Sequence, residues 1–166
     1  MTKDEFECLF DLKVAEPLHQ SGFRRSGKSL YMKENLALVS LIRVGGRMAQ
    51  PGAISHVICA RMLFMRDRME LVPDGFVPDP FDYPFKFLPT KLPAKLQYFE
   101  RLDFQERDSS SVQHDLGKIF SGIVERILPW ATTLGAAVVK DQLLTLGENA
   151  WCERMWIEDC EHDLNG

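Results

Sequence analysis

The spacing of apolar residues changes twice along this chain, and this change restricts the possible folds more than any other feature of the sequence. Over residues 3–20, apolar side chains recur every three or four positions, as on one face of an amphipathic helix. From 23 to 65 the spacing becomes that of short strands separated by turns. Helical spacing returns after residue 108. This order predicts an α+β fold with an N-terminal helix, an antiparallel meander sheet of four to five strands, and C-terminal helices packed on one face.

Length and composition agree with one domain. The chain has 166 residues, of which 45% are hydrophobic and 27% charged, which is enough to bury a sizeable core. We find no internal repeat and no interdomain linker. We therefore expect a single α+β domain over residues 1–166.

Capping and turn residues set the limits of the expected elements. The first helix begins at a capping box of Thr2 and Glu5, Pro17 should kink or tighten its last turn, and Gly22 should end it. Residues 36–44 are apolar on both faces, which favours a central strand. The expected strands are 23–25, 29–33, 36–44, 55–65 and 96–104, and the expected later helices are 109–129, 130–146 and a short one after Gly147.

A segment at residues 73–93 holds six of the nine prolines together with five aromatic residues. Proline at this density argues against a helix or a central strand, so we expect an ordered loop without a place in the sheet. Two interpretations remain open. The loop packs on its own domain, or it presents rings such as Phe76, Phe81 and Phe85 to a partner.

The segment Gly22–Ser29 satisfies the P-loop expression G-x-x-x-x-G-K-[ST], but its surroundings differ from those of a P-loop. A P-loop follows a buried strand and opens a helix whose N-terminus holds the phosphates. Here the segment follows a helix and precedes a strand-like run. We therefore predict a β-hairpin with Ser26 and Gly27 at its turn and without affinity for nucleotide.

The same region carries a resemblance to a protein family. Glu16–Leu18, Gly22–Arg25 and Gly27–Tyr31, followed later by Ile127–Trp130, resemble the pattern of a group of small uncharacterised bacterial proteins that share a domain of unknown function. Residues 73–93 depart from that pattern. The resemblance implies an α+β fold without catalytic residues. Because some members neighbour toxin-immunity systems, it also implies an immunity-like role in protein binding.

Positive charge is concentrated in the first part of the chain. Residues 1–70 carry 11 basic and 8 acidic residues, and the remainder carries 9 and 16. Arginines of the expected sheet, including Arg25, Arg43 and Arg61, could gather around an anion, with His56 beside them. Pairing of these residues with the acidic half is the simpler alternative. A pI near 5.6 and the lack of a recognisable reading module argue against nucleic acid as a partner.

No arrangement of residues forms a specific catalytic or metal-binding signature. The four histidines form no pair at metal-ligand spacing and the four cysteines form no CxxC motif, so we predict no catalytic residues, no metal and no cofactor. Cys8 and Cys59 should be buried and slow to react, whereas Cys152 and Cys160 should react sooner.

The beginning of the sequence is acidic and lacks the apolar region of a secretory signal, so we expect a cytoplasmic protein that does not contact the membrane. The leading hypothesis is a non-catalytic bacterial binding module that acts through protein-protein interaction, with another protein or a second copy as its partner. The alternative is a small-anion-binding protein or an enzyme that uses the arginines of the sheet.

Overall fold

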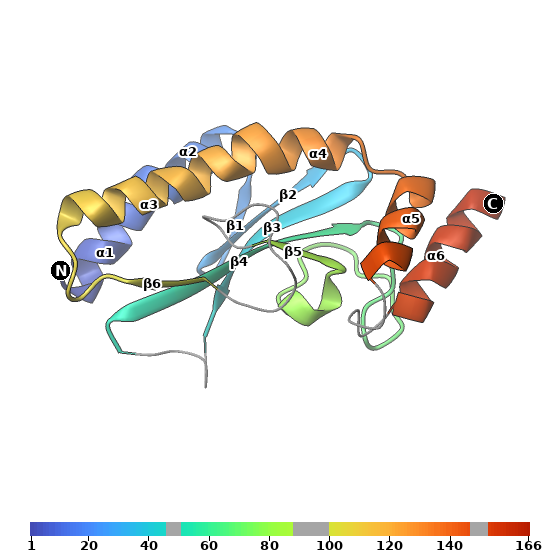
Figure 1. The fold of residues 1–166 in the computed structure, drawn as a ribbon, viewed down its shortest axis with the longest axis horizontal. Helices are drawn as coiled ribbons and strands as arrows, with labels where there is room; N and C mark the ends of the chain where they lie inside the picture. The colour runs from blue at the N-terminus through green and yellow to red at the C-terminus, as the bar shows by residue number, and fades with distance from the viewer. Residues whose placement is uncertain (46–50, 88–99, 147–152) are drawn as a thin grey trace.

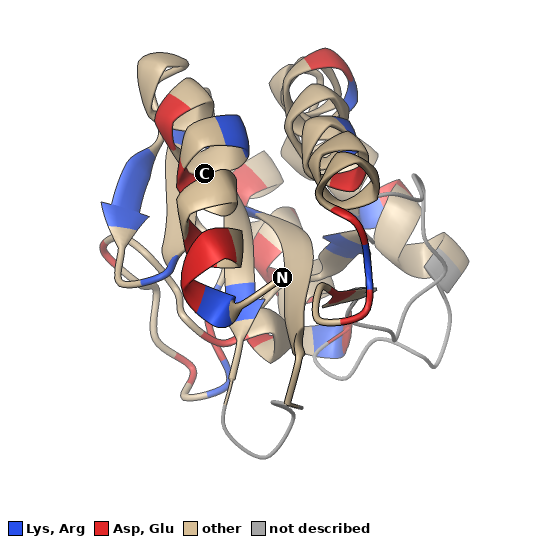
Figure 2. Cartoon of the chain, turned by 90° about the vertical axis from the view of Figure 1, so that its left-hand side faces the viewer, with Lys and Arg blue, Asp and Glu red and all other residues tan. Residues whose placement is uncertain are grey.

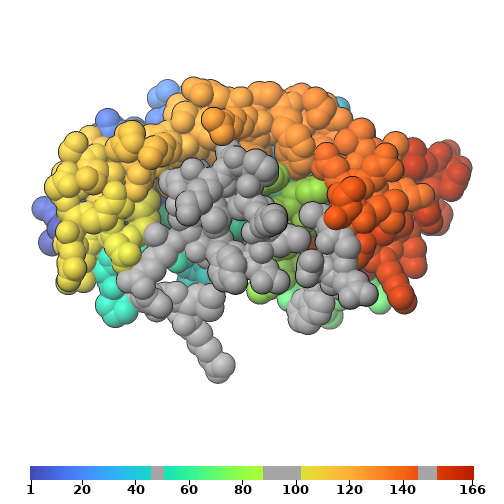
Figure 3. Space-filling model, in the orientation of Figure 1, coloured from blue at the N-terminus to red at the C-terminus, as the bar shows by residue number. Residues whose placement is uncertain are grey.

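The computed structural model describes residues 1–45, 51–87, 100–146 and 153–166 (Figure 1). Its helical elements, in chain order, are α1 (Lys3–Phe10), a π-helical turn (Asp11–Ala15), α2 (Glu16–Gln20), a 3-10 turn (Pro80–Asp82), α3 (Ser109–Gly122), a second π-helical turn (Ile123–Ile127), α4 (Leu128–Thr132), α5 (Ala136–Leu146) and α6 (Glu153–Asn165). In Figure 3 the helices from α3 to α5 form a continuous band along one side of the molecule. Within the described ranges, no single helix has the length and apolar composition that crossing a membrane requires. The helices Ser109–Thr132 and Ala136–Thr145, which are bent by 112° at the break between them, reach that length and composition only when they are taken together.

The sheet is antiparallel throughout its described strands. These strands are β1 (Arg24–Ser26), β2 (Ser29–Glu34), β3 (Ala37–Val44), β4 (Ala53–Met62), β5 (Phe85–Phe87) and β6 (Glu100–Asp103). They pair in the order β1-β2-β3-β4-β5, and β6 also pairs with β4. β5 and β6 follow one another along the same edge of β4, since β5 pairs with Ile58–Ala60 and β6 with Ala53–His56. The predicted α+β fold with a meander sheet and C-terminal helices is confirmed.

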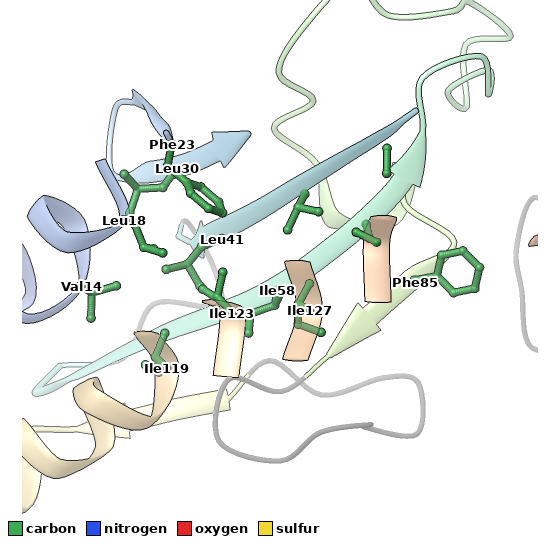
Figure 4. Close-up of a cluster of buried hydrophobic side chains, with 14 of the residues drawn as sticks. Val14, Leu18, Phe23, Leu30, Leu41, Ile58, Phe85, Ile119, Ile123 and Ile127 are labelled. Carbon is green, nitrogen blue, oxygen red and sulfur yellow. The ribbon is translucent and has the colours of Figure 1, made fainter. Parts of the chain in front are cut away.

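Both faces of the sheet are buried. The two long helices, α1 to α2 and α3 to α4, lie next to each other on one face (Figures 1 and 2). The core beneath them includes Val14, Leu41, Ile58, Ile119 and Ile123 (Figure 4). The opposite face carries a smaller cluster of buried residues: Leu38, Ile42, Val57, Cys59, Val77 and Tyr83. Val77 and Tyr83 come from the segment between β4 and β5. β3 lies between β2 and β4, so the predicted central strand is confirmed.

Each long helix contains a proline and accommodates it with a π-helical turn. The residue before Pro17 donates its N–H to the carbonyl of Asp11, and the residue before Pro129 donates to the carbonyl of Ile123. This wider turn makes room for a ring that would clash with an ordinary α-helical turn. The turn at Pro17 is therefore widened and not tightened. The predicted boundary at residue 129 is also displaced, because that helix continues to Thr132 before the chain bends.

The proline-rich segment contributes a strand, which contradicts the expectation that it has no place in the sheet. β5 begins directly after Pro84, has three residues and, among the described strands, pairs only with β4. A proline just before a short edge strand removes no hydrogen bond from the ladder. Residues 88–93, like residues 96–99 of the predicted fifth strand, lie outside the described ranges.

The segment Gly22–Ser29 forms the predicted hairpin. Ser26 pairs with Ser29 where β1 and β2 meet, and Gly27 has a φ of +57°, which glycine adopts without strain. The element that follows is the strand β2. The loop therefore lacks the helix N-terminus on which a P-loop holds its phosphates.

We expect Mg-ATP to leave the melting temperature unchanged, and Lys28→Ala to change the free energy of unfolding by less than about 0.5 kcal/mol. The ammonium group of Lys28 lies 3.3 Å from the Glu7 carboxylate, and half of the lysine side chain is exposed. Exposed ion pairs of this kind contribute little to stability. Differential scanning fluorimetry with and without Mg-ATP tests this. A rise of several degrees in the parent that disappears in Lys28→Ala would contradict the prediction.

The burial of the cysteines differs from the prediction at two positions. Cys59 is buried on β4, as predicted. Cys8 is exposed, because the two phenylalanines of α1 occupy the face that packs on the sheet and Cys8 lies away from them. Cys160 is buried on the inner face of α6, where desolvation raises the pKa of its thiol to about 11. Cys152 lies outside the described residues.

In a native thiol-labelling assay we therefore expect Cys8 to react rapidly and both Cys59 and Cys160 to react slowly. Desolvation raises the pKa of the two buried thiols, so little thiolate is present at neutral pH. The Cys8→Ser variant should lose one rapidly reacting thiol, whereas Cys59→Ser should lose none. An unchanged rapid phase in Cys8→Ser would show that this assignment is wrong.

Candidate functional site

The arginines singled out in the sequence do not gather at one place. Arg25 lies on β1, is exposed and forms an ion pair with Asp11. Arg43 on β3 projects toward the helices, whereas Arg61 on β4 projects into the opposite face of the sheet. The structure therefore forms no clamp from these three side chains, and each has its own partners within the domain.

Arg43 and His56 form a cluster with Glu7 and Phe10 of α1. Arg43 on β3 and His56 on β4 are directly opposite each other in the sheet. The Nε of Arg43 donates to Nε2 of His56 at 3.1 Å, and its Nη1 donates to Oε1 of Glu7 at 2.6 Å. The ring of Phe10 stacks on His56 at 4.8 Å between centroids and lies 4.9 Å from the Arg43 guanidinium carbon. His56 is 1% exposed, so it is engaged inside the domain and does not present its ring to a ligand as the anion-binding alternative requires.

The charges of this cluster follow from its contacts. Burial, with the Arg43 guanidinium beside it, holds the pKa of His56 well below its usual range. Since Nε2 accepts a hydrogen bond from Arg43, the ring proton of the neutral imidazole is on Nδ1. Partial burial opposes ionisation of Glu7, but hydrogen bonds from Arg43 and Lys28 leave the pKa of this carboxyl below its ordinary value. The cluster is thus a neutral imidazole beside a paired cation and anion.

An open pocket of about 1000 Å³ adjoins this cluster. The first turn of α1, the end of β3 and the start of β4 line it. Its charged lining residues are Lys3, Asp4, Glu7, Lys28 and Arg43. The Nη2 of Arg43 is buried and has no hydrogen-bond partner in the described part of the chain. An anion beside Arg43 would compete with the Glu7 carboxylate, which already pairs with Lys28 and Arg43. The geometry therefore gives little support to the anion-binding alternative.

Arg61 fastens the segment between β4 and β5 to the second face of the sheet. It is 1% exposed, and its Nη1 donates to the carbonyl of Asp82 at 2.9 Å while its Nη2 donates to the carbonyl of Met65. Its guanidinium carbon lies 5.9 Å from the ring centroid of Tyr83, whose hydroxyl donates to the carbonyl of Val77 at 2.8 Å. Desolvation lowers the pKa of Arg61, although the group stays charged at neutral pH. Its position indicates a structural role.

Two further arginines hold the outer part of this segment. The N–H and Nε of Arg66 donate to the two oxygens of Asp159 on α6 at 2.8 and 2.6 Å, and its carbonyl accepts from Nε1 of Trp156 at 3.0 Å. The N–H and Nε of Arg68 donate to Oδ1 of Asp82 at 3.0 and 2.8 Å. The segment is therefore fixed both to itself and to α6.

The three aromatic residues predicted to bind a partner have different environments. Phe85 is buried and meets Trp130 edge-on at 5.3 Å between ring centroids. Phe76 is half-buried and stacks on Tyr31 at 5.1 Å. Phe81 is 48% exposed. The described part of the proline-rich loop therefore packs mainly on its own domain, and Phe81 is the most exposed of these three rings.

A surface that the sequence analysis missed lies beside Phe81. Residues 67–71 form a tight turn in which the Asp67 carboxylate accepts two backbone N–H groups, and the Arg68 guanidinium carbon lies 5.8 Å from the Phe81 ring centroid. Four large apolar side chains of this region are exposed, and we call them the apolar tip: Met69 (78%), Leu71 (65%), Val72 (56%) and Phe81 (48%). In the sequence these residues form a short apolar group beside a charged run, and neither has the periodic spacing of a helix or strand. Such a pattern is typical of many loops, so it does not by itself predict a binding surface.

The described ranges contain no group of three or more histidine, cysteine, aspartate or glutamate side chains that could hold a metal ion. The resemblance to small bacterial proteins remains a prediction. Comparison with known proteins finds no matching family model, no matching curated protein and no matching solved structure.

Proposed function

We propose that this protein is a non-catalytic binding module whose partner is another protein, and that it binds this partner through the apolar tip. The bacterial, cytoplasmic and immunity-like setting expected from the sequence belongs to the same proposal. One observation carries it. Four large apolar side chains, 48–78% exposed, project from a segment that hydrogen bonds and ion pairs hold in place.

Single exposed apolar residues are ordinary on protein surfaces, but a group of them on one fixed segment favours an interface. A fixed segment loses little conformational entropy when a partner binds, so more of the contact energy remains as affinity. The arginine that lies over Phe81 adds a planar cation of the kind enriched in interface cores. In contrast, His56 and Arg61, on which an enzyme would depend, are buried and engaged within the domain.

The proposal is tested with a triple variant of the full chain, Met69→Ser, Leu71→Ser and Phe81→Ser. The matched control is Leu12→Ser with Leu144→Ser, two residues that are each 56% exposed and belong to other elements. Tagged parent, triple variant and control are used to capture proteins from the native host, followed by quantitative mass spectrometry. The best-enriched protein is then purified and its binary affinity measured.

We expect the triple variant to melt within a few degrees of the parent and to bind the purified partner at least about tenfold more weakly, a loss of about 1.4 kcal/mol. The control should bind as the parent does. Sedimentation velocity of the parent alone shows whether the partner is a second copy. Equal capture by all three proteins would refute the proposal, and so would a triple variant that loses stability while its affinity is retained.

A further inference from the structure

The apolar tip borders a groove of about 920 Å³ between the segment that follows β4 and the last turns of α6. Phe64 and Val72 line one side of this groove, and Val72 also belongs to the apolar tip. The other side is formed by α6, with Glu158, Glu161 and Asp163 among its lining residues. A partner that covers the apolar tip would therefore also meet the acidic side of the groove.

The groove is strongly acidic. Four carboxylates line it, those of Glu158, Asp159, Glu161 and Asp163, together with the guanidinium of Arg66. Lys140 of α5 compensates one of them, since its ammonium pairs with Glu161 at 2.8 Å. Arg66 already pairs with Asp159 at 2.6 Å and with Glu158 at 3.2 Å. The side chain of Glu158 is nevertheless 67% exposed, and Asp163 forms no ion pair within the described ranges. The carboxyl end of α6 adds the negative end of a helix dipole to the same region.

The groove is also preformed. Arg66 joins its two sides, because its backbone and side chain bond to Asp159 and its carbonyl accepts from Trp156. Trp156 is 1% exposed and packs in the main core, so α6 is fixed against the domain. A site with fixed walls and an excess of carboxylates over paired cations is electrostatically complementary to a basic segment.

We propose that the groove receives basic side chains of the protein partner, whose neighbouring apolar residues cover the apolar tip. This inference rests on the proposed function and adds the chemistry of the partner. Lysine or arginine side chains lay their aliphatic stems on Phe64 and Val72 and place their charged ends beside Glu158 and Asp163. The partner is therefore a protein segment in which apolar and basic residues are interspersed.

Two fluorescein-labelled peptides of equal length serve as probes, one of alternating leucine and lysine and one of alternating leucine and glutamate. Fluorescence anisotropy with the full-length protein should show binding of the lysine peptide alone. Its Kd should rise about tenfold as the salt concentration goes from 50 to 300 mM, because added salt screens these charges. Glu158→Gln with Asp163→Asn should weaken binding about tenfold. The matched control, Glu16→Gln with Glu125→Gln, removes the same charge from exposed positions on other helices and should bind as the parent does.

Equal binding of the two peptides, or equal affinity of the acidic-groove variant and its control, would overturn the inference. A rise in melting temperature with calcium alone that depends on Glu158 and Asp163, with no binding of the lysine peptide, would overturn it in favour of a cation site. The failure of this inference can be distinguished from the failure of the proposed function. If the apolar-tip variant loses the natural partner while Glu158→Gln with Asp163→Asn keeps it, the protein-binding function stands and the basic partner is excluded.

Discussion

Arg61→Met is expected to lower the free energy of unfolding by about 2–4 kcal/mol. Methionine has a similar length but no donor, so the buried carbonyls of Asp82 and Met65 lose their guanidinium partner. Each buried acceptor left without a hydrogen bond costs about 1–3 kcal/mol. Removal of a desolvated charge offsets part of this loss, which sets the lower limit of the range.

Urea denaturation of the parent, Arg61→Met and Arg24→Met measures this effect. Arg24 is an exposed residue of β1, and its substitution should change stability by less than about 0.5 kcal/mol. Hydrogen exchange adds a local measurement, since amides between Met65 and Asp82 should lose protection in Arg61→Met first. A variant with the stability and the exchange pattern of the parent would show that Arg61 does not hold this segment.

The sheet could be predicted from the sequence because its strands are short, sequential and joined by turns with clear signals. Apolar residues on both faces of residues 36–44 predicted that β3 is central, and the turn at Ser26 and Gly27 predicted the first hairpin. β5 was missed because proline density is an average over a segment. The three residues that follow Pro84 are enough for an edge strand, and such a strand needs no long apolar run.

The candidate site could be predicted only in part, because its residues come together through packing of distant elements. The alternation of side chains along β4 already places His56 and Arg61 on opposite faces, since they are five positions apart. The alternation along β4 therefore excludes a single anion-binding site that contains both side chains. That Arg43 pairs with Glu7 depends on how α1 lies on the sheet, and no local pattern encodes this contact.

Only part of the apolar tip could be predicted from the sequence. Phe81 was predicted to bind a partner because it is an aromatic residue in a proline-rich loop, and it is exposed. Phe85 belongs to the same pattern but is buried, because β5 carries it toward Trp130. Met69 and Leu71 are exposed because the Asp67 carboxylate closes a turn beneath them. Tertiary contacts therefore decide which apolar residues of this segment reach solvent.

The stability of the protein should fall with pH below about 6.5, because His56 is buried in its neutral form. Its folded pKa is well below 6.5, whereas in the unfolded chain the imidazole titrates near that value. The unfolded state therefore binds more protons as the pH falls, and folding loses about 1.4 kcal/mol per pH unit until the folded pKa is reached. Between pH 7.5 and pH 5.0 this single group should lower the free energy of unfolding by at most about 2 kcal/mol.

His56→Gln should remove this slope whatever its effect on stability at pH 7.5, because glutamine does not titrate. His114→Gln, on the exposed side of α3, should retain it. Urea denaturation at several pH values between 7.5 and 5.0 measures the slopes. The contribution of Glu7 falls in a separate window, since its pKa is lowered from 4.5 and the stability that it provides is lost below that pH. A parent protein with constant stability from pH 7.5 to 5.0 would mean that His56 accepts a proton in the folded state. The hydrogen bond from Arg43 to its Nε2 would then have to break, and the cluster beside Phe10 would have a second arrangement at low pH.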